Sequence, residues 1–152
     1  MPKLNWTAPV IPPRLPGWEN ALAATMQRHM ALPISYGTSD CLLQIADVCL
    51  AMTGVDPMRR LRRYRTETGA LRIMAALGFG DVEQALAAVF PRIDGVGNAL
   101  RGDAGIVERL VDGHLVLSAV VIIGHMAVGK DDFGHAPVST LALKSAFAIG
   151  AR

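Results

Sequence analysis

Apolar and polar positions follow helical spacing through the first half of the chain. Trp18, Leu22, Met26 and Met30 recur every four residues, a spacing that places all four on one face of a helix. Pro33 cannot continue that helix, so its end is predicted before this residue. The stripe is typical of a helix that buries one side against a core.

Three more helices follow from the same periodicity and from their end signals. They are predicted over residues 40–52, over residues 66–77, and from Asp81 to just before Pro91. The first of the three is closed by a Thr-Gly pair, and the second stops at a glycine. Asp81 with Gln84 three residues later resembles a capping box, which marks the start of the last helix.

Beyond residue 99 the pattern changes to short β-rich runs separated by glycines. Strands are predicted at residues 106–107, 115–123 and 126–128. Within the longest, residues 120–123 are continuously apolar, as in a strand buried on both faces. Helices first and strands later predict an α+β fold, in which a small antiparallel sheet or half-barrel packs on the helix of residues 40–52.

The first seventeen residues differ from the rest in composition. Residues 2–16 hold five of the nine prolines of the chain and predict an extended arm. Such an arm cannot order itself, so a partner or the surface of the domain must hold it. We therefore divide the chain into an arm over residues 1–17 and a single domain over residues 18–152.

Composition limits the classes of protein to which this chain can belong. The chain has 152 residues, of which 51% are hydrophobic and 18% charged, and its net charge of +2 is too small to indicate nucleic-acid binding. No signal peptide or membrane span is visible. Cys41 and Cys49 would lie about 12 Å apart on one helix, beyond disulfide reach. Reduced thiols predict a soluble protein assembled in a cytoplasm.

Cys41 is the residue for which a catalytic role is most readily predicted. It follows the glycine-containing run Tyr36–Asp40 and opens the helix of residues 40–52. The positive end of a helix dipole and its unpaired N–H groups favour an anion there, which would stabilise a thiolate. Thiol hydrolases obtain their nucleophile in this way. The alternative is that Cys41 is a small core residue, since free cysteines are usually buried.

The run Tyr36–Cys41 resembles the nucleophile motif of the NlpC-type, papain-like cell-wall endopeptidases, and Arg101–Val107 is similar to the Gly-Asp strand that opens their barrel. The likeness is closer to a phage-encoded branch, the tail-tip peptidase-like proteins of tailed phages or gene transfer agents. Residues 52–57, 69–71 and 146–150 match that branch. The resemblance implies a papain-like fold with Cys41 as nucleophile and with Tyr36, Gly37 and Asp40 shaping the oxyanion turn.

A thiol nucleophile needs an imidazole base. The histidine motif of the endopeptidases, set on residues 118–124, places Ser118 at the histidine position, and serine cannot deprotonate a thiol. His114 or His125 would be the base if the register differs, and His135 is a further candidate. The alternative is that all three are half-exposed residues at loop ends. His29 is predicted at the surface of the first helix.

An arginine-rich segment follows the helix of residues 40–52. Arginine binds carboxylates and phosphates through a planar fork, so this cluster could hold peptide carboxylates or an acidic neighbouring subunit, or it could be a solvated basic face. No cofactor site is predicted, and no histidine–cysteine spacing indicates a metal site. The interface candidates are Arg59, Arg60, Arg62, Arg63, Tyr64 and Arg65.

Two functions follow from these features. The first is a structural subunit of a phage or phage-like tail tip, built on a degenerate NlpC-type fold and contacting other tail proteins through the arm and the arginine cluster. It would reside in the virion after assembly in the host cytoplasm. The second is an active cysteine endopeptidase that cleaves peptidoglycan stem peptides during cell entry. The serine at the expected histidine position favours the first.

Overall fold

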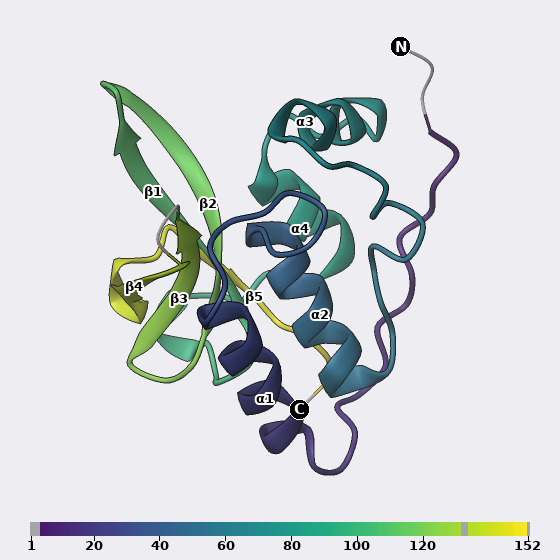
Figure 1. Cartoon of the computed structure of the whole chain (residues 1–152). Helices are drawn as coiled ribbons and strands as arrows, with labels where there is room; N and C mark the ends of the chain where they lie inside the picture. Colours follow the sequence, from purple (N-terminus) through teal and green to yellow (C-terminus); the bar gives the residue numbers. More distant parts are fainter. Residues whose placement is uncertain (1–3, 132–133, 152) are drawn as a thin grey trace.

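The computed structural model describes residues 4–131 and 134–151, and its architecture is α+β, as predicted (Figure 1). The helices come first in the chain and the strands later. In the described residues the helices are α1 (Trp18–Met30), α2 (Cys41–Thr53), α3 (Glu67–Ala76) and α4 (Val82–Val89). All four predicted helices are confirmed, and their ends lie within about two residues of those expected.

The helix ends are set by the capping residues that the sequence displays. The side chains of Asp40, Thr66 and Asp81 each accept a hydrogen bond from a backbone N–H in the first turn of the helix that follows. Gly54 ends α2 in the left-handed conformation, with φ of 81°. These local signals explain why the helices could be located from the sequence.

The strands form one antiparallel sheet in the order β4-β3-β2-β1-β5 within the described residues. Their bounds are β1 Ala104–Val111, β2 His114–Ile122, β3 Met126–Asp131, β4 Gly134–Ser139 and β5 Ser145–Phe147, with short 3₁₀ turns at Val96–Asn98 and Thr140–Ala142. β3 pairs with β2 only at residues 121 and 122, so the sheet opens beyond that point. The hairpin of β1 and β2 extends past it (Figure 1).

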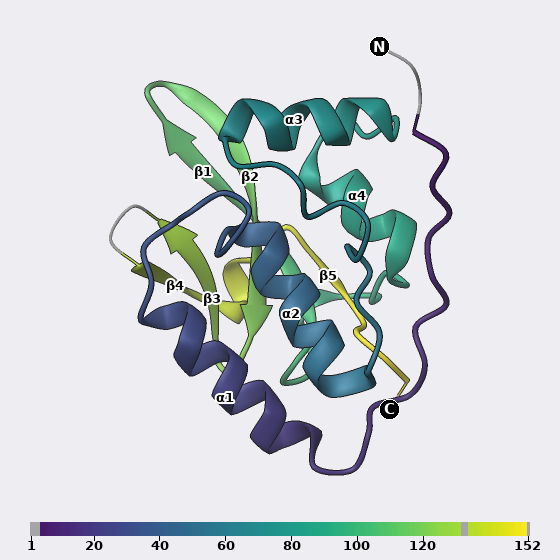
Figure 2. The ribbon, with the colours of Figure 1, turned by 45° about the vertical axis from the view of Figure 1, so that its right-hand side comes forward.

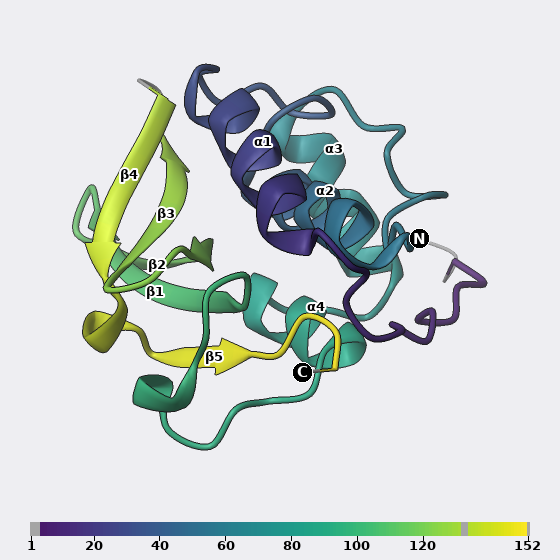
Figure 3. The same cartoon turned by 90° about the horizontal axis from the view of Figure 1, so that it is seen from below.

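The helices cover one face of the sheet, as Figure 3 shows from below. Ala119 and Val121 of β2 belong to the core cluster under α1 and α2, whereas Val120 and Ile122 belong to a second cluster on the opposite face. All four side chains are buried. The prediction of a strand buried on both faces is therefore confirmed as far as Ile122, while Ile123 is 36% exposed.

The surface of the domain itself holds the N-terminal arm. The arm descends past α3 and α2 (Figures 1 and 2). The Leu4 N–H donates to the Ala76 carbonyl at 3.0 Å, and the Leu15 N–H donates to the Met52 carbonyl at 2.7 Å. Between these two anchors, Trp6 packs edge-on against Phe79 with ring centroids 6.1 Å apart.

Arg14 joins the arm to the end of the described chain. Its Nε donates to the Ile149 carbonyl at 2.9 Å, and its Nη2 pairs with the Asp103 carboxylate at 2.9 Å. Both charged side chains are almost fully buried. The guanidinium also stacks over the Trp18 ring. The arm is thus part of the folded unit.

None of the helices in the described ranges is long and apolar enough to cross a membrane.

Candidate functional site

The run before Cys41 folds into a tight turn that leads into α2. Ser35 and Ser39 pair across this turn, and Gly37 lies in it with φ of 87°. A Cβ atom on Gly37 would stand 2.1 Å from the Tyr64 carbonyl oxygen. Glycine is therefore required at this position for two reasons: the backbone conformation and the close approach of the Tyr64 segment.

The Asp40 carboxylate organises that turn. It is buried and accepts hydrogen bonds from the N–H groups of Leu42 and Leu43, at 3.1 and 2.9 Å, and from the Gly37 N–H at 3.3 Å. The Tyr64 hydroxyl donates to it at 2.7 Å. Asp40 thus caps α2 and ties the arginine-rich segment to the turn.

The capped helix end does not activate the thiol. Burial, together with the negative charge of Asp40, raises the pKa of Cys41 from its ordinary 9.0 to about 11, although backbone hydrogen bonds at Ala119 and Leu42 lower it. This shift has the opposite direction to that of the expected stabilised thiolate. The first-turn N–H groups of Leu42 and Leu43 already bind a carboxylate.

The residue of β2 beside the thiol is Ala119. Ala119 is buried in the core cluster, and Cys41 is partly buried and packs against that cluster close to the Ala119 backbone. Ser118, the expected histidine position, pairs with Val107, which belongs to the cluster on the other face of the sheet. Because side chains alternate along a strand, Ser118 points away from α2. The β2 side chain on the face toward α2 is therefore that of Ala119, which cannot act as a base.

The two histidines proposed as bases stand at opposite ends of β2. His114 is exposed at the hairpin turn, five residues from Ala119, or about 16 Å at strand rise. His125 is exposed in the turn between β2 and β3. The side chain of His135 lies outside the described part of the structure. Among the described side chains, no imidazole hydrogen-bonds to the Cys41 thiol.

His29, predicted at the surface, is instead fully buried. Its Nδ1 lies 2.7 Å from the Ser39 hydroxyl, and its Nε2 lies 2.7 Å from the Asp47 carboxylate. Two polar partners make burial of this imidazole tolerable. Ser39 is itself fully buried, so this serine–histidine–aspartate chain is shut off from substrate and joins α1, the turn and α2. No local pattern predicts this contact, because the partners of His29 lie ten and eighteen residues away in the chain.

The arginine-rich segment separates into structural and exposed members. Arg62 makes hydrogen bonds to Asp47 at 2.7 Å and to Asp56 at 2.8 and 3.1 Å. Tyr64 is buried against Asp40, and Arg65 donates to the carbonyls of residues 62 and 64. Arg65 is exposed despite these two hydrogen bonds, and Arg59, Arg60 and Arg63 are exposed as well. Half of the proposed interface candidates therefore hold the fold together.

Comparison with known proteins places the chain in a family. The family model described as "Domain of unknown function (DUF6950)" matches residues 13–149. The chain belongs to the DUF6950 family. No curated protein and no solved structure matches it. The match spans α1 to β5 and includes both the Cys41 turn and the arginine-rich segment.

Among the side chains that the structure describes, no group of three or more histidine, cysteine, aspartate or glutamate residues comes together. Two-ligand contacts such as His29 with Asp47 fall short of the set that a zinc site needs.

The buried carboxylate of Asp47 predicts a pH-dependent stability for the DUF6950 domain. Burial raises its pKa, but hydrogen bonds from His29 and Arg62 outweigh that effect and hold it below the ordinary value. A lowered pKa stabilises the fold above about pH 4, and this stabilisation is lost as the pH falls through the folded-state pKa. We expect Asp47→Asn to cost about 2 kcal/mol at pH 7 and less near pH 3.

Urea unfolding of both proteins at the two pH values measures this difference. An equal loss in the free energy of unfolding at both pH values would show that the charge of the Asp47 carboxylate does not contribute to stability.

Proposed function

We propose that the DUF6950 domain is a structural subunit of the tail tip of a phage or phage-like particle, built on an NlpC-type fold without catalysis. The observation that carries the proposal is that, among the described side chains, no imidazole hydrogen-bonds to the Cys41 thiol, and that the residue of β2 beside this thiol is Ala119. The resemblance of residues 52–57, 69–71 and 146–150 to the phage branch supplies the setting.

The roles of the motif residues support the same reading. Gly37, Asp40 and Tyr64 fix the turn through close packing and hydrogen bonds. Residues that stabilise the fold in this way are needed whether or not the protein catalyses a reaction. The helix that begins with Cys41 packs on an antiparallel sheet, an arrangement that fits the NlpC-type expectation.

An inert thiol is the first testable consequence. In a Cys49→Ala variant, Cys41 is the lone cysteine. With its pKa at about 11, the folded protein should react with iodoacetamide at pH 7 about 100-fold more slowly than the same protein unfolded in guanidinium, because only the thiolate reacts. Mass spectrometry of timed samples gives both rates. A folded-state rate equal to or above the unfolded one would show an activated nucleophile.

Two experiments test the function itself, one on phage or phage-like particles and one on cell wall. We expect the chain in purified particles of a producing strain, and a Cys41→Ala strain should release the same number of particles. Purified protein should liberate no new amino groups from peptidoglycan, with or without Cys41. Cys41-dependent hydrolysis would establish the active endopeptidase instead, and absence of the chain from particles would refute the tail setting.

A further inference from the structure

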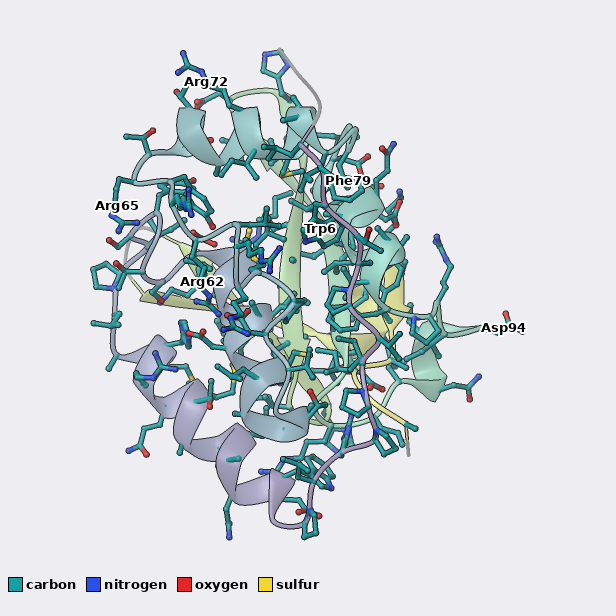
Figure 4. The ribbon with its side chains drawn as sticks, turned by 90° about the vertical axis from the view of Figure 1, so that its right-hand side faces the viewer. Trp6, Arg62, Arg65, Arg72, Phe79 and Asp94 are labelled. Carbon is teal, nitrogen blue, oxygen red and sulfur yellow. The ribbon has the colours of Figure 1, made fainter. Side chains whose placement is uncertain are left out.

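A groove of about 890 Å³ runs between the N-terminal arm and the segment that follows α2. Residues 4–9 form one wall and residues 54–61 the other. Figure 4 views this side of the molecule, with the arm passing in front and Trp6 turned toward Phe79. Its volume lies within the range of sites that take small ligands or short peptide segments.

Aliphatic side chains line part of the groove floor. Leu50, on the outer side of α2, is 43% exposed there, and Val55 is partly exposed beside it. A large aliphatic side chain so exposed next to a concave wall gains from being covered by another apolar group. The floor therefore favours a ligand that carries apolar side chains.

The charge of the groove is positive. Arg59 and Arg60 line it, are exposed, and form no ion pair with the described acidic residues. Asp56 also lines it, but its carboxylate is bound by Arg62 through two hydrogen bonds and by the Met58 N–H. Two uncompensated guanidinium groups select for an anionic partner.

The arm adds an extended backbone to this wall. It is anchored at Leu4 and Leu15, and Trp6 holds it against Phe79. In the described part of the chain, the N–H groups of residues 5–8 make no hydrogen bond. An extended segment with free donors pairs readily with another extended chain.

We propose that this groove binds an extended acidic segment of a partner protein, an inference that rests on the structural role proposed above. Carboxylates of the segment pair with Arg59 and Arg60, and its apolar side chains cover Leu50 and Val55. Single-stranded nucleic acid fits less well, because part of the floor is aliphatic and the Trp6 ring is already packed on Phe79.

The probe is a short fluorescein-labelled peptide rich in glutamate, with leucine at every third position. Fluorescence polarisation should show saturable binding that weakens as salt rises from about 0.05 to about 0.5 M. The double variant Arg59→Glu, Arg60→Glu should bind at least about tenfold more weakly. Arg72→Glu is the matched control, because Arg72 is exposed on α3 away from the groove and should leave the affinity unchanged (Figure 4).

Three outcomes overturn the inference: equal affinity of the double variant and the wild type, equal binding of a peptide with lysine in place of glutamate, or binding of oligothymidylate but not of the peptide. Thermal unfolding of each variant checks that it is folded. A failure of the proposed function would be detected by a different result. Cys41-dependent cleavage of the bound peptide would refute the structural role while leaving the groove assignment intact.

Discussion

Replacing Gly37 by alanine is expected to lower the free energy of unfolding by about 3 kcal/mol or more. The backbone at Gly37 has φ of 87°, which already strains any other residue. The new Cβ would also stand 2.1 Å from the Tyr64 carbonyl oxygen and 2.9 Å from Arg65 Nη1. The arginine side chain can move away, but the Tyr64 backbone cannot, because its hydroxyl is fixed on Asp40.

Gly78→Ala supplies the matched control for this substitution. Gly78 has φ of 85°, and a Cβ there would meet nothing within 4 Å. The Gly78→Ala substitution should lower the free energy of unfolding by about 1 kcal/mol, which is the conformational cost alone. Urea unfolding of the two variants separates conformational strain from steric clash. Equal losses would show that the Tyr64 segment does not approach Gly37 closely.

The second large effect is expected for Asp40→Ala, at about 3 kcal/mol. This substitution removes the cap of α2 and leaves the Tyr64 hydroxyl, in a side chain only 6% exposed, without its acceptor. Burial, with the charge of Asp40, raises the pKa of the Tyr64 phenol, so the hydroxyl keeps its proton and remains a donor at ordinary pH.

Asp81→Ala is the comparison for Asp40→Ala, because Asp81 caps α4 at an exposed site with one hydrogen bond to the Gln84 N–H. That variant should lose about 1 kcal/mol, as helix caps generally do. A double-mutant cycle of Asp40→Ala with Tyr64→Phe then isolates the buried contact. If Asp40→Ala costs no more than Asp81→Ala and the cycle shows no coupling, Asp40 acts as an ordinary cap.

The helices of this protein could be predicted because their signals are local. Asp40 and Asp81 stand directly before the helices that they cap, and Gly54 stands directly after one. The strand β4 is not among the predicted strands, because Pro137 within residues 134–139 argues against a strand. Proline is tolerated there because β4 is the edge strand of the sheet and pairs only with β3.

The candidate site could be predicted only in part. Cys41 was correctly placed at the start of a helix, but its environment depends on contacts between distant segments. Which of Ser118 and Ala119 faces α2 is a matter of one residue in register, and residues 120–122 are apolar on both faces and so give no clue. The burial of His29 depends on Asp47 and Ser39, which only the packing of α1 on α2 brings near it.

The Arg14 contacts also determine when this protein can finish folding. Arg14 donates to the carbonyl of Ile149, 135 residues later in the chain, and its salt bridge with Asp103 spans 89 residues. A ribosome adds about 5–20 residues per second, so the arm waits several seconds for its binding site. The bond from Arg14 to Ile149 can form only once residue 149 has left the ribosome. Docking of the arm on the domain is therefore completed late, when these two residues meet.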